Sequence, residues 1–158
     1  MSGALDDMYR DIIMDHYRSP RGRKPLERAD VTSDGSNPSC GDEIQLEVEL
    51  NDDTVKDVHV DCRGCAISVA SGSMLAEVIK GKSLAEARRI AEHVRKMLRG
   101  ESIEMADDLS DLTALQGVRN FPVRVKCALL AWITLMEGIK SHENGRSATP
   151  HASTEDNE

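Results

Sequence analysis

Aromatic residues are scarce in this sequence, whose 158 residues include one Trp, one Phe and two Tyr. Hydrophobic residues nonetheless make up 39% of the chain, which is enough for a modest core. That core must be built from aliphatic side chains and methionine, whose flexible thioether fills irregular gaps. The length fits one domain, because two domains would each be small.

Long apolar runs are missing as well. The longest extends only from Ala128 to Ile133, whereas a membrane-spanning helix needs about 20 apolar residues. The N-terminal stretch MSGALDDMYRD has neither the basic start nor the apolar segment of a secretion signal. We therefore expect a cytoplasmic protein without membrane contact, in a compartment where thiols stay reduced.

A net positive charge is also absent, since the formal charge is −8 at neutral pH. Proteins that bind nucleic acids need a basic surface to contact the phosphates. The basic residues between Arg18 and Lys24 form a local cluster, which is either solvated surface or a docking site for a partner. We therefore expect no nucleic-acid partner.

The spacing of apolar residues predicts one helix followed by an antiparallel hairpin. Apolar residues recur at helical intervals over residues 5–17. Residues 19–39 contain several Pro and Gly residues, which predicts a long loop. Apolar and polar residues then alternate over 44–50 and again over 58–60, as in half-buried strands.

The second half of the chain is predicted to be helical. Ser83 and Glu86 form a capping box, and Pro122 suits a first helical position. The helical segments fall at 66–80, 84–98 and 123–140, with a short piece at 109–115. Residues 141–158 lack apolar periodicity and are expected to be a disordered tail. The predicted fold is α+β, with a small antiparallel sheet packed against helices in a domain spanning 1–140.

Four cysteines carry the candidate chemistry: Cys40, Cys62, Cys65 and Cys127. In a reducing compartment they indicate metal binding or thiol chemistry more than disulfides. Cys40 precedes a predicted strand, Cys65 lies between a strand and a helix, and Cys127 lies early in the last helix. Such positions let side chains from distant segments converge. The N-terminus of a helix also favours the thiolate form of Cys65.

The residues alone leave the ligand set open. A tetrahedral zinc site needs four donors chosen from thiolate, imidazole and carboxylate groups. Cys62 and Cys65 form a CxxC pair, which is typical of half a zinc ribbon or of a redox site. The second CxxC pair of a ribbon is missing, and this pair does not lie in a βαβ context. A single cysteine can also be a small buried apolar residue.

Three strings resemble the ligand motifs of the IscU/NifU-like family of iron–sulfur cluster assembly proteins: NPSCGD (37–42), GCAISVASGS (64–73) and KCALLAW (126–132). They occur in the family order, with the expected strand and helix contexts. The segments 7–22 and 81–87 also resemble the family's N-terminal helix and central region. The resemblance covers residues 5–140 and implies an IscU/NifU-like fold.

Two features resemble the SufU branch of this family more than the classical IscU scaffolds. Lys126 stands where IscU-like proteins carry a His, and a protonated Lys cannot bind a metal. The segment 99–120 resembles an insertion found in SufU-like proteins. For this branch, the resemblance implies zinc held by Cys40, Asp42, Cys65 and Cys127. Cys62 and the histidines are not expected to be ligands.

The resemblance also implies a function. The expected protein is a zinc-dependent sulfurtransferase that takes persulfide sulfur from a SufS-like cysteine desulfurase and passes it to downstream SUF assembly proteins. Cys40 is the expected acceptor, because its Pro-Ser-Cys-Gly turn can move while Cys65 and Cys127 are fixed by helices. One alternative is a scaffold on which the same ligands assemble a 2Fe–2S cluster. Another is a non-enzymatic interaction module stabilised by zinc.

Overall fold

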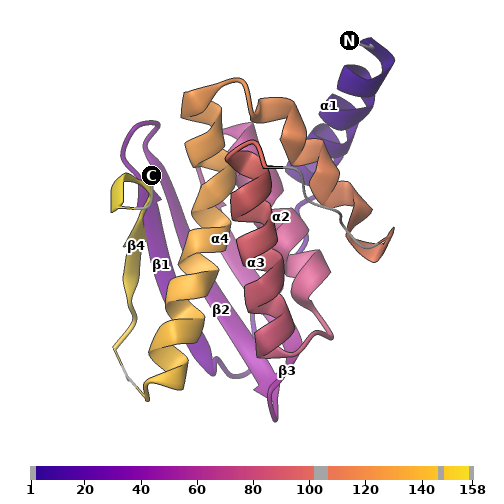
Figure 1. The fold of residues 1–158 in the computed structure, drawn as a ribbon. Coiled ribbons are helices and arrows are strands. Elements are labelled where there is room, and N and C mark those ends of the chain that lie inside the picture. Colours follow the sequence, from indigo (N-terminus) through magenta and orange to yellow (C-terminus); the bar gives the residue numbers. More distant parts are fainter. Residues whose placement is uncertain (1–2, 102–106, 146–147, 157–158) are drawn as a thin grey trace.

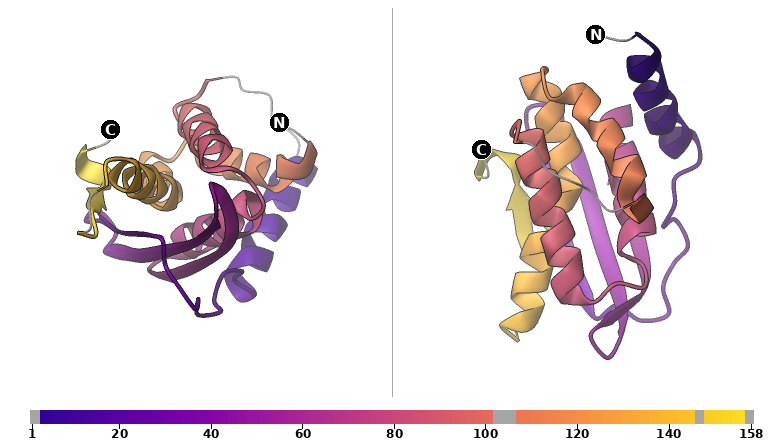
Figure 2. Two further views of the ribbon diagram at one scale, coloured as in Figure 1. Left: turned by 90° about the horizontal axis from the view of Figure 1, so that it is seen from below. Right: turned by 45° about the vertical axis from the view of Figure 1, so that its right-hand side comes forward.

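The computed structural model describes residues 3–101, 107–145 and 148–156. A four-stranded sheet with the order β3-β2-β1-β4 forms one layer, and the helices lie over one of its faces (Figures 1 and 2). This arrangement confirms the predicted α+β class. The elements are α1 (Gly3–Arg18), β1 (Val31–Asn37), β2 (Asp42–Asn51), β3 (Thr54–Arg63), α2 (Ala66–Ile79), α3 (Leu84–Leu98), η1 (Asp107–Val118), α4 (Pro122–Glu143), β4 (His151–Ser153) and η2 (Thr154–Asp156).

β2 and β3 form the predicted antiparallel hairpin. On β2, the side chains of Ile44, Leu46 and Val48 are buried in the core, while those of Glu43 and Gln45 are exposed. Asp52 has a positive φ of 56° in the tight turn between the strands, a conformation that Asp tolerates better than most residues. The alternating pattern thus identified both strands correctly.

β1 lies within residues 19–39, which the sequence predicted to be a loop. The strand pairs antiparallel with β2 over its whole length. The side chains that face inward are mostly small or polar: Val31, Ser33, Gly35 and Asn37. Gly35 allows α4 to approach closely, because a Cβ atom there would overlap the Thr134 hydroxyl. The loop prediction was wrong because this strand packs without an alternating apolar pattern.

The C-terminal residues also differ from the prediction, which made 141–158 a disordered tail. α4 continues to Glu143, and the described residues 148–156 lie along β1 (Figure 1). There β4 runs parallel to β1, with Ala152 buried opposite Gly35. A strand of three residues is too short to show periodicity, and it forms because the edge of β1 offers backbone groups to pair with.

α2 and α4 cover the sheet, whereas α3 packs on α4 as an outer layer (Figure 2). The predicted capping box begins α3, since Ser83 and Glu86 each accept the other's backbone N–H. Pro122 is the first residue of α4, as predicted. The buried Trp132 indole donates to Ser71 of α2 at 2.9 Å, which ties the two inner helices together.

α1 and η1 lie side by side against α2 (Figure 1). η1 contains the short helical piece predicted at 109–115 and continues a few residues past each end, and its Leu112 and Leu115 are fully buried. The Tyr9 hydroxyl of α1 donates to Gln116 of η1 at 3.3 Å. These contacts attach the N-terminal helix to the helical layer. Among the described residues, the helices lack the combination of length and apolarity that crossing a bilayer requires.

Candidate metal centre

Three segments that are distant in the sequence meet at one end of the sheet. The turn between β1 and β2 carries Cys40, and Asp42 begins β2. Cys65 directly precedes α2, and Cys127 lies in the second turn of α4. The pairing of β2 with β3 returns the chain to this end of the sheet, just before α2 begins. The topology therefore brings the four predicted ligands to the same end of the sheet.

Cys40, Asp42 and Cys127 form the centre of this cluster. The two sulfur atoms and one carboxylate oxygen all lie within 4.8 Å of one another. The Cys127 thiol donates to the Cys40 sulfur at 3.4 Å. Asp42 and Cys127 are 1% and 0% exposed, whereas Cys40 is exposed. Solvent and partner molecules can therefore reach the cluster at Cys40.

Cys65 lies beside these three groups. It is the N-cap residue of α2, and its N–H donates to Asp42 Oδ1 at 2.9 Å. Its sulfur lies 3.6 Å from Ser68 Oγ, and its proximity helps to raise the pKa of the Cys127 thiol. Cys65 does not belong to the set of donors within 4.8 Å of one another. The structure thus brings three predicted ligands together and places the fourth at their edge.

Two residues that the sequence analysis did not single out hold Asp42 in place. Asn37 is buried, and its Nδ2 donates to Asp42 Oδ2 at 3.0 Å and to the Cys127 sulfur at 3.5 Å. Gly64 lies against the carboxylate from another side, where a Cβ atom would overlap Asp42. Both residues lie inside the quoted motifs, but neither is a metal ligand, so a search for ligands passed over them.

The cluster concentrates acidic groups away from water. Burial raises the pKa of the Cys127 thiol far above its ordinary value, and contacts with Cys40, Asp42 and Cys65 raise that pKa further. Several such groups ionise together only when a cation balances their charge. Thiolate and carboxylate donors suit a zinc ion, and thiolates also suit the iron of an iron–sulfur cluster. The donor set therefore fits a metal centre of this kind.

Cys62 lies in a different environment. It is on β3, is 8% exposed and belongs to the hydrophobic core. Burial raises the pKa of its thiol to about 11, which keeps the thiol protonated and unreactive at neutral pH. Among the described residues, the donors that lie close together come from separate segments and do not include the CxxC pair.

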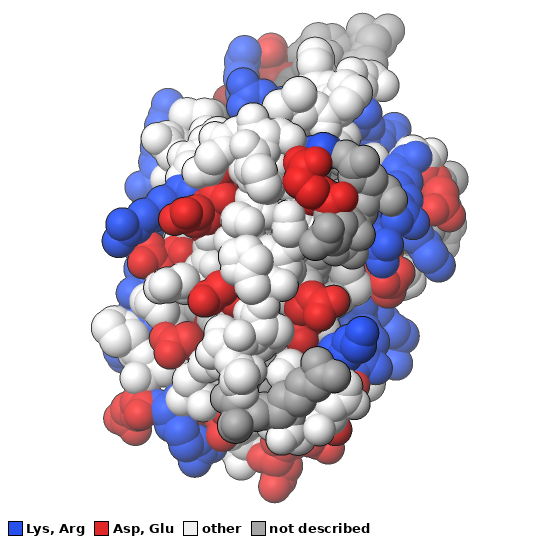
Figure 3. All heavy atoms as spheres, turned by 90° about the vertical axis from the view of Figure 1, so that its left-hand side faces the viewer, with Lys and Arg blue, Asp and Glu red and all other residues white. Residues whose placement is uncertain are grey.

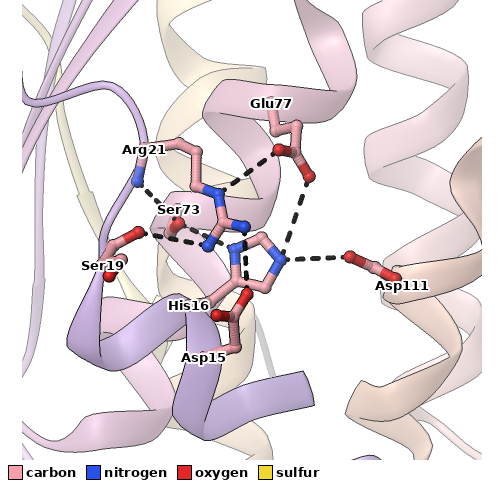
Figure 4. Close-up of polar contacts among 7 residues, drawn as sticks. All are labelled: Asp15, His16, Ser19, Arg21, Ser73, Glu77 and Asp111. Carbon is pink, nitrogen blue, oxygen red and sulfur yellow. Dashed lines mark hydrogen bonds and ion pairs between the residues drawn. The ribbon is translucent and has the colours of Figure 1, made fainter.

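A second group of potential donors surrounds His16, one of the histidines that the sequence analysis set aside. The Nε2 atom of this buried ring lies 3.2 Å from Asp111 and 4.0 Å from Glu77 (Figure 4). Its Nδ1 atom lies 2.8 Å from Ser73 Oγ, and Arg21 pairs with Glu77 at 3.3 Å. Both ring nitrogens have partners, and Arg21 neutralises Glu77. We therefore interpret this cluster as polar contacts that join α1, α2 and η1.

Comparison with known proteins matches residues 8–128 to the family described as the NifU-like N terminal domain. The chain is 43% identical over 141 residues to a Bacillus subtilis protein named zinc-dependent sulfurtransferase SufU, covering 89% of this chain and 95% of that protein. It is 41% identical over 133 residues to a Thermotoga maritima protein named iron-sulfur cluster assembly scaffold protein IscU, covering 84% and 93%.

Solved structures show the same fold. The chain is similar to a putative iron-sulfur cluster assembly scaffold protein for the SUF system from Fervidobacterium islandicum, with a TM-score of 0.76 and 34% identity over 82% of this chain and 94% of that one. A NifU-like protein from Brucella abortus shares the fold alone, with a TM-score of 0.79 at 21% identity over 89% and 97% of the two chains. The chain belongs to the family of NifU-like N-terminal domains.

Proposed function

We propose that this protein is a zinc-dependent sulfur acceptor in iron–sulfur cluster assembly. In this function it takes persulfide sulfur from a SufS-like cysteine desulfurase in the cytoplasm and passes it to downstream SUF assembly proteins. The observation that carries the proposal is an exposed Cys40 thiol beside the buried donors Asp42 and Cys127. The 43% identity to a protein named zinc-dependent sulfurtransferase supports the same assignment.

The proposed zinc ligands are Cys40, Asp42, Cys65 and Cys127. Three thiolates and one carboxylate complete a tetrahedral shell of the kind that zinc prefers. Bound zinc would keep these thiols deprotonated near neutral pH, where burial alone raises the pKa of the Cys127 thiol. Asn37 orients Asp42 and Cys127 by donating to both, and the Cys65 N–H fixes the other carboxylate oxygen of Asp42.

Cys40 is the proposed acceptor because it is the most exposed of the proposed cysteine ligands. Cys127 is fully buried within α4, and Cys65 is fixed at the first turn of α2. Cys40 lies in a turn where Gly41 has a φ of +74° and where a Cβ atom on Gly41 would meet nothing within 4 Å. Because there is open space around Gly41, the turn can move when a partner approaches.

The proposed transfer is a thiol exchange without net oxidation. The Cys40 thiolate attacks the outer sulfur of a persulfide on the desulfurase, and a new S–S bond forms. The S–S bond of the original persulfide breaks at the same time, and the desulfurase cysteine leaves as a thiolate. Cys40 then carries the persulfide.

A cluster scaffold is the second candidate, and the 41% identity to a protein named IscU scaffold favours it. Lys126 argues against it, because the side chain that precedes Cys127 cannot serve as a ligand when protonated. Its ammonium group forms an ion pair with Glu155 at 3.3 Å. Metal content separates the two candidates, since zinc is colourless whereas an iron–sulfur cluster absorbs visible light.

The test is a desulfurase assay with the full-length protein and metal analysis of the same preparation. We expect one zinc per chain and faster turnover of cysteine when the protein is added. Cys40→Ser should abolish the stimulation, whereas Cys62→Ser is the matched control and should retain it. Equal stimulation by the Cys40→Ser variant, or a coloured cluster in place of zinc, would contradict the proposal.

A further inference from the structure

The C-terminal segment reaches the metal centre from outside the residues that the family model matches. That match ends at residue 128, whereas β4 adds to the sheet beside β1 between residues 151 and 153. The Asp34 N–H donates to the Pro150 carbonyl, and Ser36 Oγ lies 3.0 Å from His151 Nε2. Figure 3 looks onto this face, where a band of uncharged side chains is flanked by acidic ones. The pairing of β4 with β1 carries the chain towards the turn that contains Cys40.

Thr154 follows β4 and contacts the residue that orients the ligands. It is 3% exposed, and its hydroxyl donates to Asn37 Oδ1 at 2.8 Å. The other end of the Asn37 amide faces the Asp42 carboxylate, which accepts hydrogen bonds but cannot donate them when ionised. The amide nitrogen must therefore point at Asp42, and the amide oxygen must point at Thr154. The Thr154 hydroxyl locks this orientation.

Glu155 makes a second, weaker connection at the surface. Its carboxylate accepts from Ser39 Oγ at 2.9 Å and from Lys126 Nζ at 3.3 Å. These two partners are the neighbours of Cys40 and Cys127 in the sequence. Glu155 is exposed, and exposed ion pairs contribute little. The buried hydrogen bond from Thr154 is therefore the main connection between the C-terminal segment and the site.

We propose that Thr154 is a positioning residue of the metal centre, which acts through Asn37 on the orientation of Asp42 and Cys127. The inference rests on the proposed function only in taking this centre as a zinc site. Without the Thr154 hydroxyl, the buried Asn37 oxygen loses its hydrogen-bond partner, and the amide is held only by its contacts with Asp42 and Cys127. The amide then orients Asp42 and Cys127 less firmly, and residues that orient ligands typically affect metal affinity 10–100-fold.

The test measures zinc release from the full-length protein to a colorimetric chelator. Thr154→Val keeps the shape of the side chain and removes the hydroxyl. We expect it to weaken zinc binding about tenfold, the low end of the range for a direct partner of a ligand, because Thr154 acts through Asn37. Thr154→Ser restores a hydroxyl and should return the affinity close to wild type. Thr149→Val is the matched control, because Thr149 lies on the same segment and bonds Thr32 at 2.9 Å, away from the ligands.

The possible outcomes test the role of Thr154 separately from the proposed function. Zinc affinity equal to wild type in Thr154→Val would overturn the role of Thr154 and leave the proposed function standing. Wild-type protein that holds no zinc would overturn the proposed function itself. A double-mutant cycle distinguishes this role from a general folding defect. In a protein that already carries Asn37→Ala, Thr154→Val should weaken zinc binding no further. An additional loss of affinity in the double variant would show that Thr154 does not act through Asn37.

Discussion

Gly64→Ala is expected to disrupt the metal centre without altering any ligand. A Cβ atom at this position would overlap the Asp42 carboxylate, which must then move. Asp42 would lose its hydrogen bonds from the Cys65 N–H and from Asn37 Nδ2. Hydrogen bonds to a charged group contribute about 1.5–3 kcal/mol each. The free energy of unfolding of the zinc-free protein should therefore fall by about 3 kcal/mol or more, and the bound zinc should be lost.

Backbone strain is the other effect of this substitution, because Gly64 has a φ of +157°. Gly100→Ala is the matched control, since its φ is +92° and a Cβ atom there would meet nothing within 4 Å. Strain alone costs about 1–3 kcal/mol, and the Gly100 variant should keep its zinc. The measurements are urea unfolding of the zinc-free proteins and zinc content as purified. Full zinc content and equal stability in both variants would refute the reasoning.

Three other substitutions test separate parts of the account. Cys127→Ala should lose most of the bound zinc whereas Cys62→Ala should keep it, as measured by metal analysis; the reverse result would favour the CxxC pair. The Cys62 thiol should also make stability depend on pH. Its pKa is raised from 9.0 in the unfolded chain to about 11 by burial, so the unfolded chain releases the proton first as the pH rises. The unfolding free energy of the zinc-free protein should therefore fall between pH 9 and 11, by about 2–3 kcal/mol more in wild type than in Cys62→Ala. An equal fall in both proteins, measured by urea unfolding over this pH range, would contradict this. Ser73→Ala removes the partner of His16 Nδ1 and of the Arg21 N–H, and should lower the unfolding free energy by about 1–3 kcal/mol while zinc content stays unchanged.

The parts of the fold that the sequence predicted are those where apolar side chains mark a face. Ile44, Leu46 and Val48 alternate along β2 and point into the core. β1 gave no such signal, because its inward positions include Ser33 and Gly35, which let α4 approach closely. The short β4 depends on hydrogen bonds with the edge of β1 rather than on its own residue pattern.

The candidate site likewise contains residues that the sequence predicted and residues that it did not. The cysteines and Asp42 have side chains with recognisable metal chemistry, and the family motifs pointed to them. Asn37 and Thr154 act by orienting other groups, and a common amide or hydroxyl gives no chemical signal in a sequence. Their contact joins residues 117 positions apart, and it exists only because β4 pairs with β1. The sequence therefore predicts the donors better than the residues that hold them.

The most direct test of the central claim is to locate the transferred sulfur. The full-length protein is incubated with a cysteine desulfurase and free cysteine, and its peptides are then analysed by mass spectrometry without reduction. We predict one added sulfur on the peptide that contains Cys40, and none in the Cys40→Ser variant. Sulfur on Cys62 or Cys127, with Cys40 unmodified and dispensable for stimulating the desulfurase, would contradict the account.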